Sequence, residues 1–181
     1  MSLKELTAEK HKMAESTPFM KAVFAKTLPF NLLVDWTYQK SLFYSTIEGC
    51  AGANRLLDDL PDIRRNFYLY LDFKEMWNSN MPYPSYKKTV INYHDYLLSV
   101  SNDKNKIMAH LYTWHMGDMF GGQMIKKIVP GSHRNLEFND TKTLINNIRQ
   151  KLNDNMADEA NNAFDWAISM MREYDTSLGQ N

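Results

Sequence analysis

The segment KIMAHLYTWHMGDMFGGQMIKKIV, residues 106–129, constrains the fold more than any other part of the chain. Its apolar residues recur at helical spacing, yet Gly117, Gly121 and Gly122 lie inside it. A glycine within a helix costs about 1 kcal/mol relative to alanine, so three of them require a compensating interaction. Gly117 and Gly121 are four residues apart and therefore share one helix face. Their spacing fits either tight helix–helix packing or a notch that a flat ligand approaches.

The rest of the chain also shows helical periodicity and little of the alternation typical of strands. No internal repeat and no long linker divides it, so we expect one domain over residues 1–181. The fold class predicted is all-α, a bundle of seven or eight helices. The helices are expected at residues 3–15, from Pro18 onward, at 31–57, from Pro61 to Trp77, at 85–99 with Ser85 as the cap, and at 106–129, 140–154 and 156–175.

Composition excludes several classes of protein. Lys plus Arg and Asp plus Glu both number 21, so the formal charge is zero and nothing favours nucleic-acid binding. Cys50 is the single cysteine, which excludes an internal disulfide and any site that needs several thiolates. The charged first twenty residues do not resemble a signal peptide, and no apolar run reaches the length of a membrane span. We expect a soluble, cytoplasmic, monomeric protein without a membrane anchor.

The histidines indicate which metal chemistry is possible. No Glu-x-x-His pair of the ferritin-like di-iron type and no His-Glu-x-x-His zinc motif occurs. A lone histidine can still bind heme iron, because the porphyrin supplies the other four nitrogens. His11 on the first predicted helix is a candidate, and a solvated helix histidine is the alternative. Asp118, placed among the glycines, is either an outer-face residue or part of a hydrogen-bond network.

Two segments together resemble the heme oxygenase family. Residues 112–128, YTWHMGDMFGGQMIKKI, resemble its distal-helix signature Gly-Asp-Leu-Ser-Gly-Gly-Gln. Residues 3–20, LKELTAEKHKMAESTPFM, resemble its proximal helix, in which the iron-ligating histidine follows a threonine by four positions. The resemblance implies a helical bundle with heme between the proximal and distal helices. It also implies cleavage of heme to biliverdin, CO and iron, with O2 and electrons from a soluble donor such as reduced ferredoxin.

The resemblance assigns roles to the residues of the two helices. His11 would be the proximal iron ligand, and Glu15 would support it, as metal-bound imidazoles generally require. Gly117 and Gly121, with Gly122 beside them, would let the distal helix lie over the heme. Asp118 would hold an ordered water near bound dioxygen. An ordinary exposed pair of residues one turn apart remains the alternative for His11 and Glu15.

Other positions are implied at the edge of the heme. Tyr112 matches a network or heme-edge tyrosine, and Phe164 matches a phenylalanine that packs on the heme. Lys4 and Arg149 match cations that would bind the two propionates, Arg149 being preferred for its forked guanidinium. Core packing for the aromatic residues and solvation for the cations are the alternatives.

The chain departs from the family pattern at three positions. Phe120 replaces a small serine, His115 stands where tyrosine is common, and Ala8 stands where many members have a second lysine. These changes bear on the rate and regiochemistry of ring opening. Two other functions stay open: a non-catalytic heme-binding or heme-delivery protein, which would need neither Asp118 nor the glycine pair, and a thiaminase-like enzyme that uses Cys50.

Overall fold

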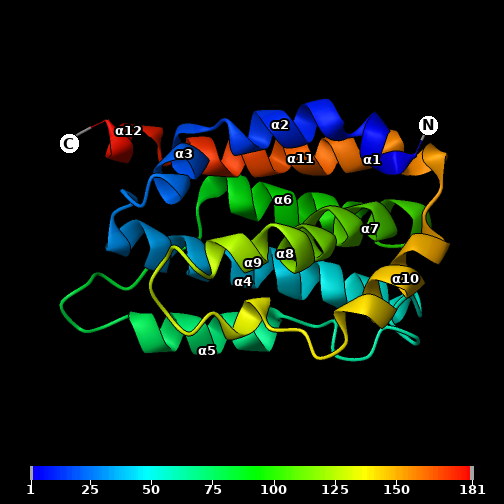
Figure 1. Ribbon diagram of the computed structural model, residues 1–181, viewed down its shortest axis with the longest axis horizontal. Helices are drawn as coiled ribbons and strands as arrows, with labels where there is room; N and C mark the ends of the chain where they lie inside the picture. Colours follow the sequence, from blue (N-terminus) through cyan, green and yellow to red (C-terminus); the bar gives the residue numbers. More distant parts are fainter. Residues whose placement is uncertain (1, 180–181) are drawn as a thin grey trace.

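The computed structural model describes residues 2–179, and every regular element among them is helical. The predicted all-α fold is therefore confirmed. Figure 1 shows three levels: α2 and α11 along the top, α4, α6 and α7 in the middle with α10 at their right-hand end, and α5 below. The elements are α1 (Leu3–Leu6), α2 (Ala8–Glu15), α3 (Pro18–Phe24), α4 (Phe30–Ala53), α5 (Asn66–Met76), α6 (Lys88–Ser99), α7 (Lys104–Leu111), the π-helical η1 (Tyr112–Met116), α8 (Gly117–Phe120), α9 (Gly122–Ile125), the 3-10 turn η2 (Arg134–Leu136), α10 (Thr141–Lys151), the 3-10 turn η3 (Asp154–Met156), α11 (Ala157–Arg172) and α12 (Asp175–Leu178).

Helix α4 is the centre of the bundle. It is 24 residues long and packs against α5, α6 and α7. Phe43, Tyr44 and Ile47 on α4 are completely buried, and burying a side chain of this size contributes about 1.5–3 kcal/mol. This packing fixes α4 as the rigid support for the elements that lie across it.

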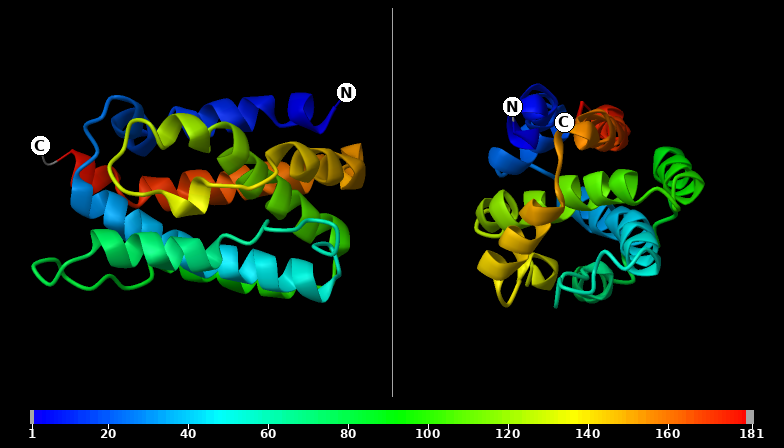
Figure 2. Two further views of the ribbon diagram at one scale, coloured as in Figure 1. Left: turned by 60° about the horizontal axis from the view of Figure 1, so that its bottom comes forward. Right: turned by 90° about the vertical axis from the view of Figure 1, so that its right-hand side faces the viewer.

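The first predicted helix is divided in two at Thr7. A capping box between Ser2 and Glu5 begins α1, and the Thr7 hydroxyl donates to the Leu3 carbonyl at 2.9 Å where α1 ends. Helix α2 then packs against α11, as Figure 1 and the end-on view in Figure 2 show. The expectation of one continuous helix over 3–15 is thus corrected.

The glycine-containing segment is not one regular helix either. α7 passes into the π-helical turn η1, which is followed by α8, a turn at Gly121, and α9. The helical part ends at Ile125 rather than near residue 129. π-helical turns are rare and are frequently found at functional sites, so this local change of winding indicates that the segment belongs to a functional site.

Several helix boundaries differ from expectation, among them the start of α5 at Asn66 rather than Pro61, the start of α6 and the end of α4. Ser85 does not cap α6, which begins at Lys88; Gln39 accepts from the Lys87 N–H and donates to the Ser85 carbonyl, both at 2.9 Å. α4 ends at Ala53, four residues before the predicted end, as the Asn54 amide donates to the Cys50 carbonyl. Within residues 2–179 no helix is both long and apolar enough to span a membrane.

Candidate functional site

Asp118 on α8 is held by two side chains of α4. Its Oδ2 accepts from the Tyr44 hydroxyl at 2.5 Å, and its Oδ1 lies 3.5 Å from Lys40 Nζ. Burial, followed by the nearby Asp118 carboxylate, raises the pKa of Tyr44 well above its usual value, so this hydroxyl stays protonated and donates. A carboxylate has about four lone-pair positions, and two are used here. Asp118 can therefore still accept hydrogen bonds from water.

Glu48 continues the same face of α4 one turn further on. Its carboxylate accepts from the backbone N–H groups of Arg65 at 2.5 Å and Asn66 at 3.2 Å. It also lies 3.0 Å from Nε2 of His115, and both side chains are at most 1% exposed. Lys40, Tyr44 and Glu48, spaced four residues apart, form what we call the α4 polar row. This row ties η1 and α8 to the central helix.

A second buried polar chain holds η1 from the other side. The Trp114 indole N–H donates to the Tyr93 hydroxyl at 3.0 Å, and that hydroxyl lies 2.7 Å from His110 Nδ1. His110 Nε2 is 2.8 Å from a Glu159 oxygen, to which the Tyr96 hydroxyl also donates. Burial raises the pKa of Glu159, but these hydrogen bonds outweigh it and lower the pKa to about 2. Burial lowers the pKa of His110, which stays neutral.

The three glycines serve two different purposes. A Cβ on Gly117 would meet no atom within 4 Å, and one on Gly121 would meet only the Gly117 carbonyl at 3.3 Å. A Cβ on Gly122 would lie 2.8 Å from Leu136 Cδ2. Gly122 is therefore a packing glycine, whereas Gly117 and Gly121 leave an open notch in the helix surface. Both interpretations of the glycine spacing apply, each to its own residues.

Apolar side chains stand exposed beside this notch. Phe120 is 55% exposed and Met124, one turn later, is 60% exposed. Exposed apolar side chains of this size next to an open backbone face are typical of a surface that an apolar ligand covers. The side chain of Phe120, the residue that departs from the family signature, is directed outward, so it leaves Asp118 and its α4 partners undisturbed.

His11 lies on α2 with its side chain 58% exposed. Its ring is 5.6 Å from the Phe164 ring on α11, and its Nε2 is 3.4 Å from Glu15 Oε1. Glu15 is 51% exposed. The imidazole is thus accessible, and among residues 2–179 its one polar side-chain contact is the loose one with Glu15, which suits a group that binds an incoming ligand.

The remaining predicted site residues lie further apart. Lys4 on α1 and Arg149 in the last turn of α10 are exposed, and neither side chain makes a hydrogen bond or ion pair within residues 2–179. Tyr112 begins η1 and packs, partly buried, against the main core. Ala8 is exposed at the start of α2. The structure brings Asp118 together with the glycines, and His11 together with Glu15 and Phe164.

Sequence reasoning missed the α4 polar row. Its signal is the four-residue spacing of its three members, which is weak because α4 contains other polar residues such as Gln39 and Thr46. Cys50, the candidate of the thiaminase-like alternative, is 8% exposed, and burial raises the pKa of its thiol. A reactive thiol has the opposite environment. Within residues 2–179 no three His, Cys, Asp or Glu side chains come together as a metal site, so the protein alone builds no multi-ligand metal centre there.

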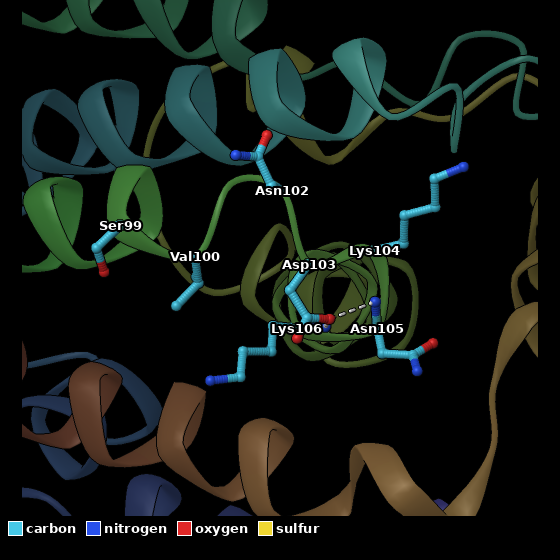
Figure 3. A pocket seen from close by; sticks show the side chains of 7 residues that line it. All are labelled: Ser99, Val100, Asn102, Asp103, Lys104, Asn105 and Lys106. Carbon is cyan, nitrogen blue, oxygen red and sulfur yellow. Dashed lines mark hydrogen bonds between the residues drawn. The ribbon is translucent and has the colours of Figure 1, made fainter.

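A small cavity beside Asp118 differs from an open depression at the start of α7. A cavity of about 70 Å³ lies beside Asp118, with Lys40, Trp36 and Leu136 among its lining residues. An open depression of about 600 Å³ lies at the start of α7, lined by residues between Ser99 and Lys106 (Figure 3). The Asp103 carboxylate in this depression caps α7, because it accepts hydrogen bonds from the backbone N–H groups of residues 105 and 106. The depression is therefore a helix start and not a reactive site.

Known proteins are similar to this chain in sequence and in fold. The family model described as heme oxygenase matches residues 1–146. Heme oxygenase 2 of Macaca fascicularis is 25% identical over 96% of this chain, which spans 64% of that relative's length. The heme oxygenase of Porphyra purpurea is 27% identical over 97% of this chain and 86% of its own length.

Solved structures of heme oxygenases superpose on this chain. Heme oxygenase-1 of the cyanobacterium Synechocystis, in complex with heme, superposes with a TM-score of 0.85 at 26% identity, covering 97% of this chain and 91% of the other. The heme oxygenase of Leptospira interrogans, at 23% identity and a TM-score of 0.79, covers 96% of this chain and shares the fold.

Proposed function

Because the chain belongs to the heme oxygenase family, we propose that it cleaves heme oxidatively to biliverdin, carbon monoxide and free iron. The observation that carries this proposal is the position of Asp118. This carboxylate is held by two α4 side chains directly beside a notch without side chains. A protein that only binds heme needs no such oriented acceptor, so the arrangement favours catalysis over storage or delivery.

The residues present fit heme as the substrate. When bound, heme supplies the iron that activates dioxygen and the porphyrin carbon that is oxidised. His11, exposed and loosely partnered, would bind the iron through a neutral imidazole. Glu15 would orient that ring, and Phe164, already in contact with it, would pack against the porphyrin.

On the distal side the chain supplies shape and polarity. Gly117 and Gly121 leave room for the porphyrin to approach the helix backbone, and Gly122 seats that helix against Leu136. Asp118 would accept a hydrogen bond from a water and so hold that water on the distal side of the heme. Tyr112, at the start of η1, would border the heme edge.

The edge of the heme carries two propionates, which require cations. Lys4 and Arg149 have exposed side chains without ion-pair partners within residues 2–179, so both are free to bind carboxylates. The electrons would come from a soluble donor such as reduced ferredoxin, with the protein acting as a cytoplasmic monomer. Comparing turnover with a ferredoxin system and with a membrane reductase tests this part, and turnover with the reductase alone would contradict it.

The proposal is tested by adding hemin and then ascorbate or a ferredoxin system under air. We expect the Soret band to form and then to decay while the broad absorption of a bilin grows. The Asp118→Ala variant should form the Soret band but give a lower bilin yield. A Soret band that persists in the wild type would indicate a heme-binding protein, and no Soret band at all would refute both functions.

A further inference from the structure

Lys40 places a second charge within the distal wall. Its ammonium lies 3.5 Å from Asp118 Oδ1 and 4.9 Å from the centre of the Tyr44 ring. The side chains of Lys40 and Asp118 are only 12% and 13% exposed. A charge removed from water is costly unless an opposite charge compensates it. The two groups therefore depend on each other.

The pair lines the cavity of about 70 Å³, and its carboxylate belongs to the residue that directly follows Gly117. The walls around it are largely apolar, with Phe19, Trp36 and Leu69 among them. Charges act over a longer range in such surroundings than in water. A ligand bound over Gly117 would therefore be affected by the net charge of the pair and not by Asp118 alone.

We propose that Lys40 is a positioning residue for the distal carboxylate: it holds one oxygen of Asp118 while Tyr44 holds the other, and it cancels the carboxylate charge so that an anionic ligand is accepted on the distal side of the heme. This inference rests on the proposed function, since it concerns the same site. An unpaired carboxylate would order water equally well but would repel an anionic ligand. With Lys40 in place, Asp118 keeps its acceptor positions while the pair as a whole is electrically neutral.

The test compares an anionic and a neutral ligand of the ferric heme complex. Azide and imidazole are titrated into hemin-loaded wild type and into Lys40→Met and Lys40→Arg variants at neutral pH. In Lys40→Met we expect azide affinity to fall about tenfold relative to imidazole affinity, and in Lys40→Arg the ratio should stay close to that of the wild type. Lys151→Met is the matched control, because Lys151 is also partly buried and pairs with Asp59 at 2.8 Å, neither residue lining the cavity.

A second experiment measures the contact between Lys40 and Asp118 without heme. Lys40→Met, Asp118→Asn and the double variant are unfolded with urea in the heme-free protein. If the pair is formed as described, the unfolding constants should show a coupling of about tenfold. Additive effects would overturn the assigned contact.

The outcomes distinguish the proposed cleavage of heme from the proposed role of Lys40. Equal loss of azide and imidazole binding in Lys40→Met would reduce Lys40 to a structural role and overturn the inference while leaving heme cleavage intact. A wild type that binds hemin without producing a bilin would refute the proposed activity, although the ligand ratio would still decide the role of Lys40. A wild type that binds no hemin would refute the proposed function and the anion selectivity together, and the urea cycle would then decide the contact alone.

Discussion

The proximal helix and the distal wall each contain a histidine–glutamate pair, and the two pairs differ in burial. His11 and Glu15 on α2 are 3.4 Å apart, and both are more than half exposed. His115 and Glu48 are 3.0 Å apart and almost completely buried, with the backbone N–H groups of Arg65 and Asn66 donating to the same carboxylate. The same two residue types thus form a loose surface contact on α2 and a buried contact between two helical elements in the distal wall.

This difference indicates how the site is organised. The distal wall is shaped by contacts with α4, α6 and α11 that exist without any ligand, so its geometry is preformed. The proximal group is instead an accessible imidazole, whose one polar side-chain contact within residues 2–179 is with Glu15, one turn away on the same helix. We expect heme to order the proximal side and to encounter a distal side that is already rigid.

The largest effect is expected from removing the buried carboxylate. Glu48→Ala leaves two backbone N–H groups and His115 without their acceptor, and breaking such a buried cluster costs roughly 3–5 kcal/mol. Urea unfolding of the heme-free protein at neutral pH measures this. Glu15→Ala is the control, for which less than about 1 kcal/mol is expected, since its pair is exposed. Similar losses in both variants would remove the contrast between the two regions.

Acid should act mainly through the buried pair of His110 and Glu159. Both groups have pKa values below their ordinary ones in the folded protein, so the unfolded chain binds more protons and stability falls as pH decreases. The His110 contribution is lost as pH falls below about 6.5, and the Glu159 contribution between about 4.5 and about 2. Glu159→Gln should therefore reduce the acid-induced loss by roughly 1–2 kcal/mol. Unfolding curves taken from pH 7 to pH 3 check it, and an unchanged pH dependence would contradict it.

The glycines allow a matched comparison within the distal segment. Gly122→Ala should destabilise the heme-free protein by about 1 kcal/mol, because its Cβ would press on buried Leu136. Gly117→Ala meets no atom and should stabilise the heme-free protein by up to about 1 kcal/mol, while weakening hemin binding. Thermal unfolding and hemin titration of both variants measure this. Stabilisation by Gly117→Ala with unaltered hemin affinity would show that the notch does not face the ligand.

The smallest effect on stability should come from the proximal histidine. Because His11 is more than half exposed, His11→Ala should change the free energy of unfolding of the heme-free protein by less than about 0.5 kcal/mol. The same variant should lose the spectrum of a neutral-imidazole complex and most of the stabilisation that hemin gives the wild type. Thermal unfolding with and without hemin checks both parts. A large loss without hemin would mean that α2 depends on His11 for its own folding.

The helices of this protein were predictable from sequence, whereas their exact boundaries and the contacts between distant segments were not. The helices follow from apolar periodicity, and the contact between His11 and Glu15 follows from their one-turn spacing. The break at Thr7 could not be foreseen from periodicity, because a single threonine back-bond at a helix end leaves the apolar pattern unchanged. The same applies to the start of α6, which depends on Gln39 in another helix.

The distal site shows this limit most clearly. Asp118 was predicted as a functional carboxylate, but its partner Tyr44 is 74 positions away, and no local pattern joins them. Glycine spacing likewise could not separate the notch at Gly117 from the packing contact at Gly122, because the distinction depends on where Leu136 lies. These pairings become visible only when the helices are placed against one another.

The π-helical turn Tyr112–Met116 also determines which comparisons of sequence are meaningful. An α-helix closes each hydrogen bond over four residues and this π-helical turn over five, so deleting one residue here would let the turn wind as an ordinary α-helix. The Gly-Asp signature would remain intact in the sequence, but the position of Asp118 relative to Lys40 and Tyr44 would change. In aligning this chain with others, a one-residue gap between His110 and Gly117 would therefore signify a different distal wall, even where every letter of the signature is retained.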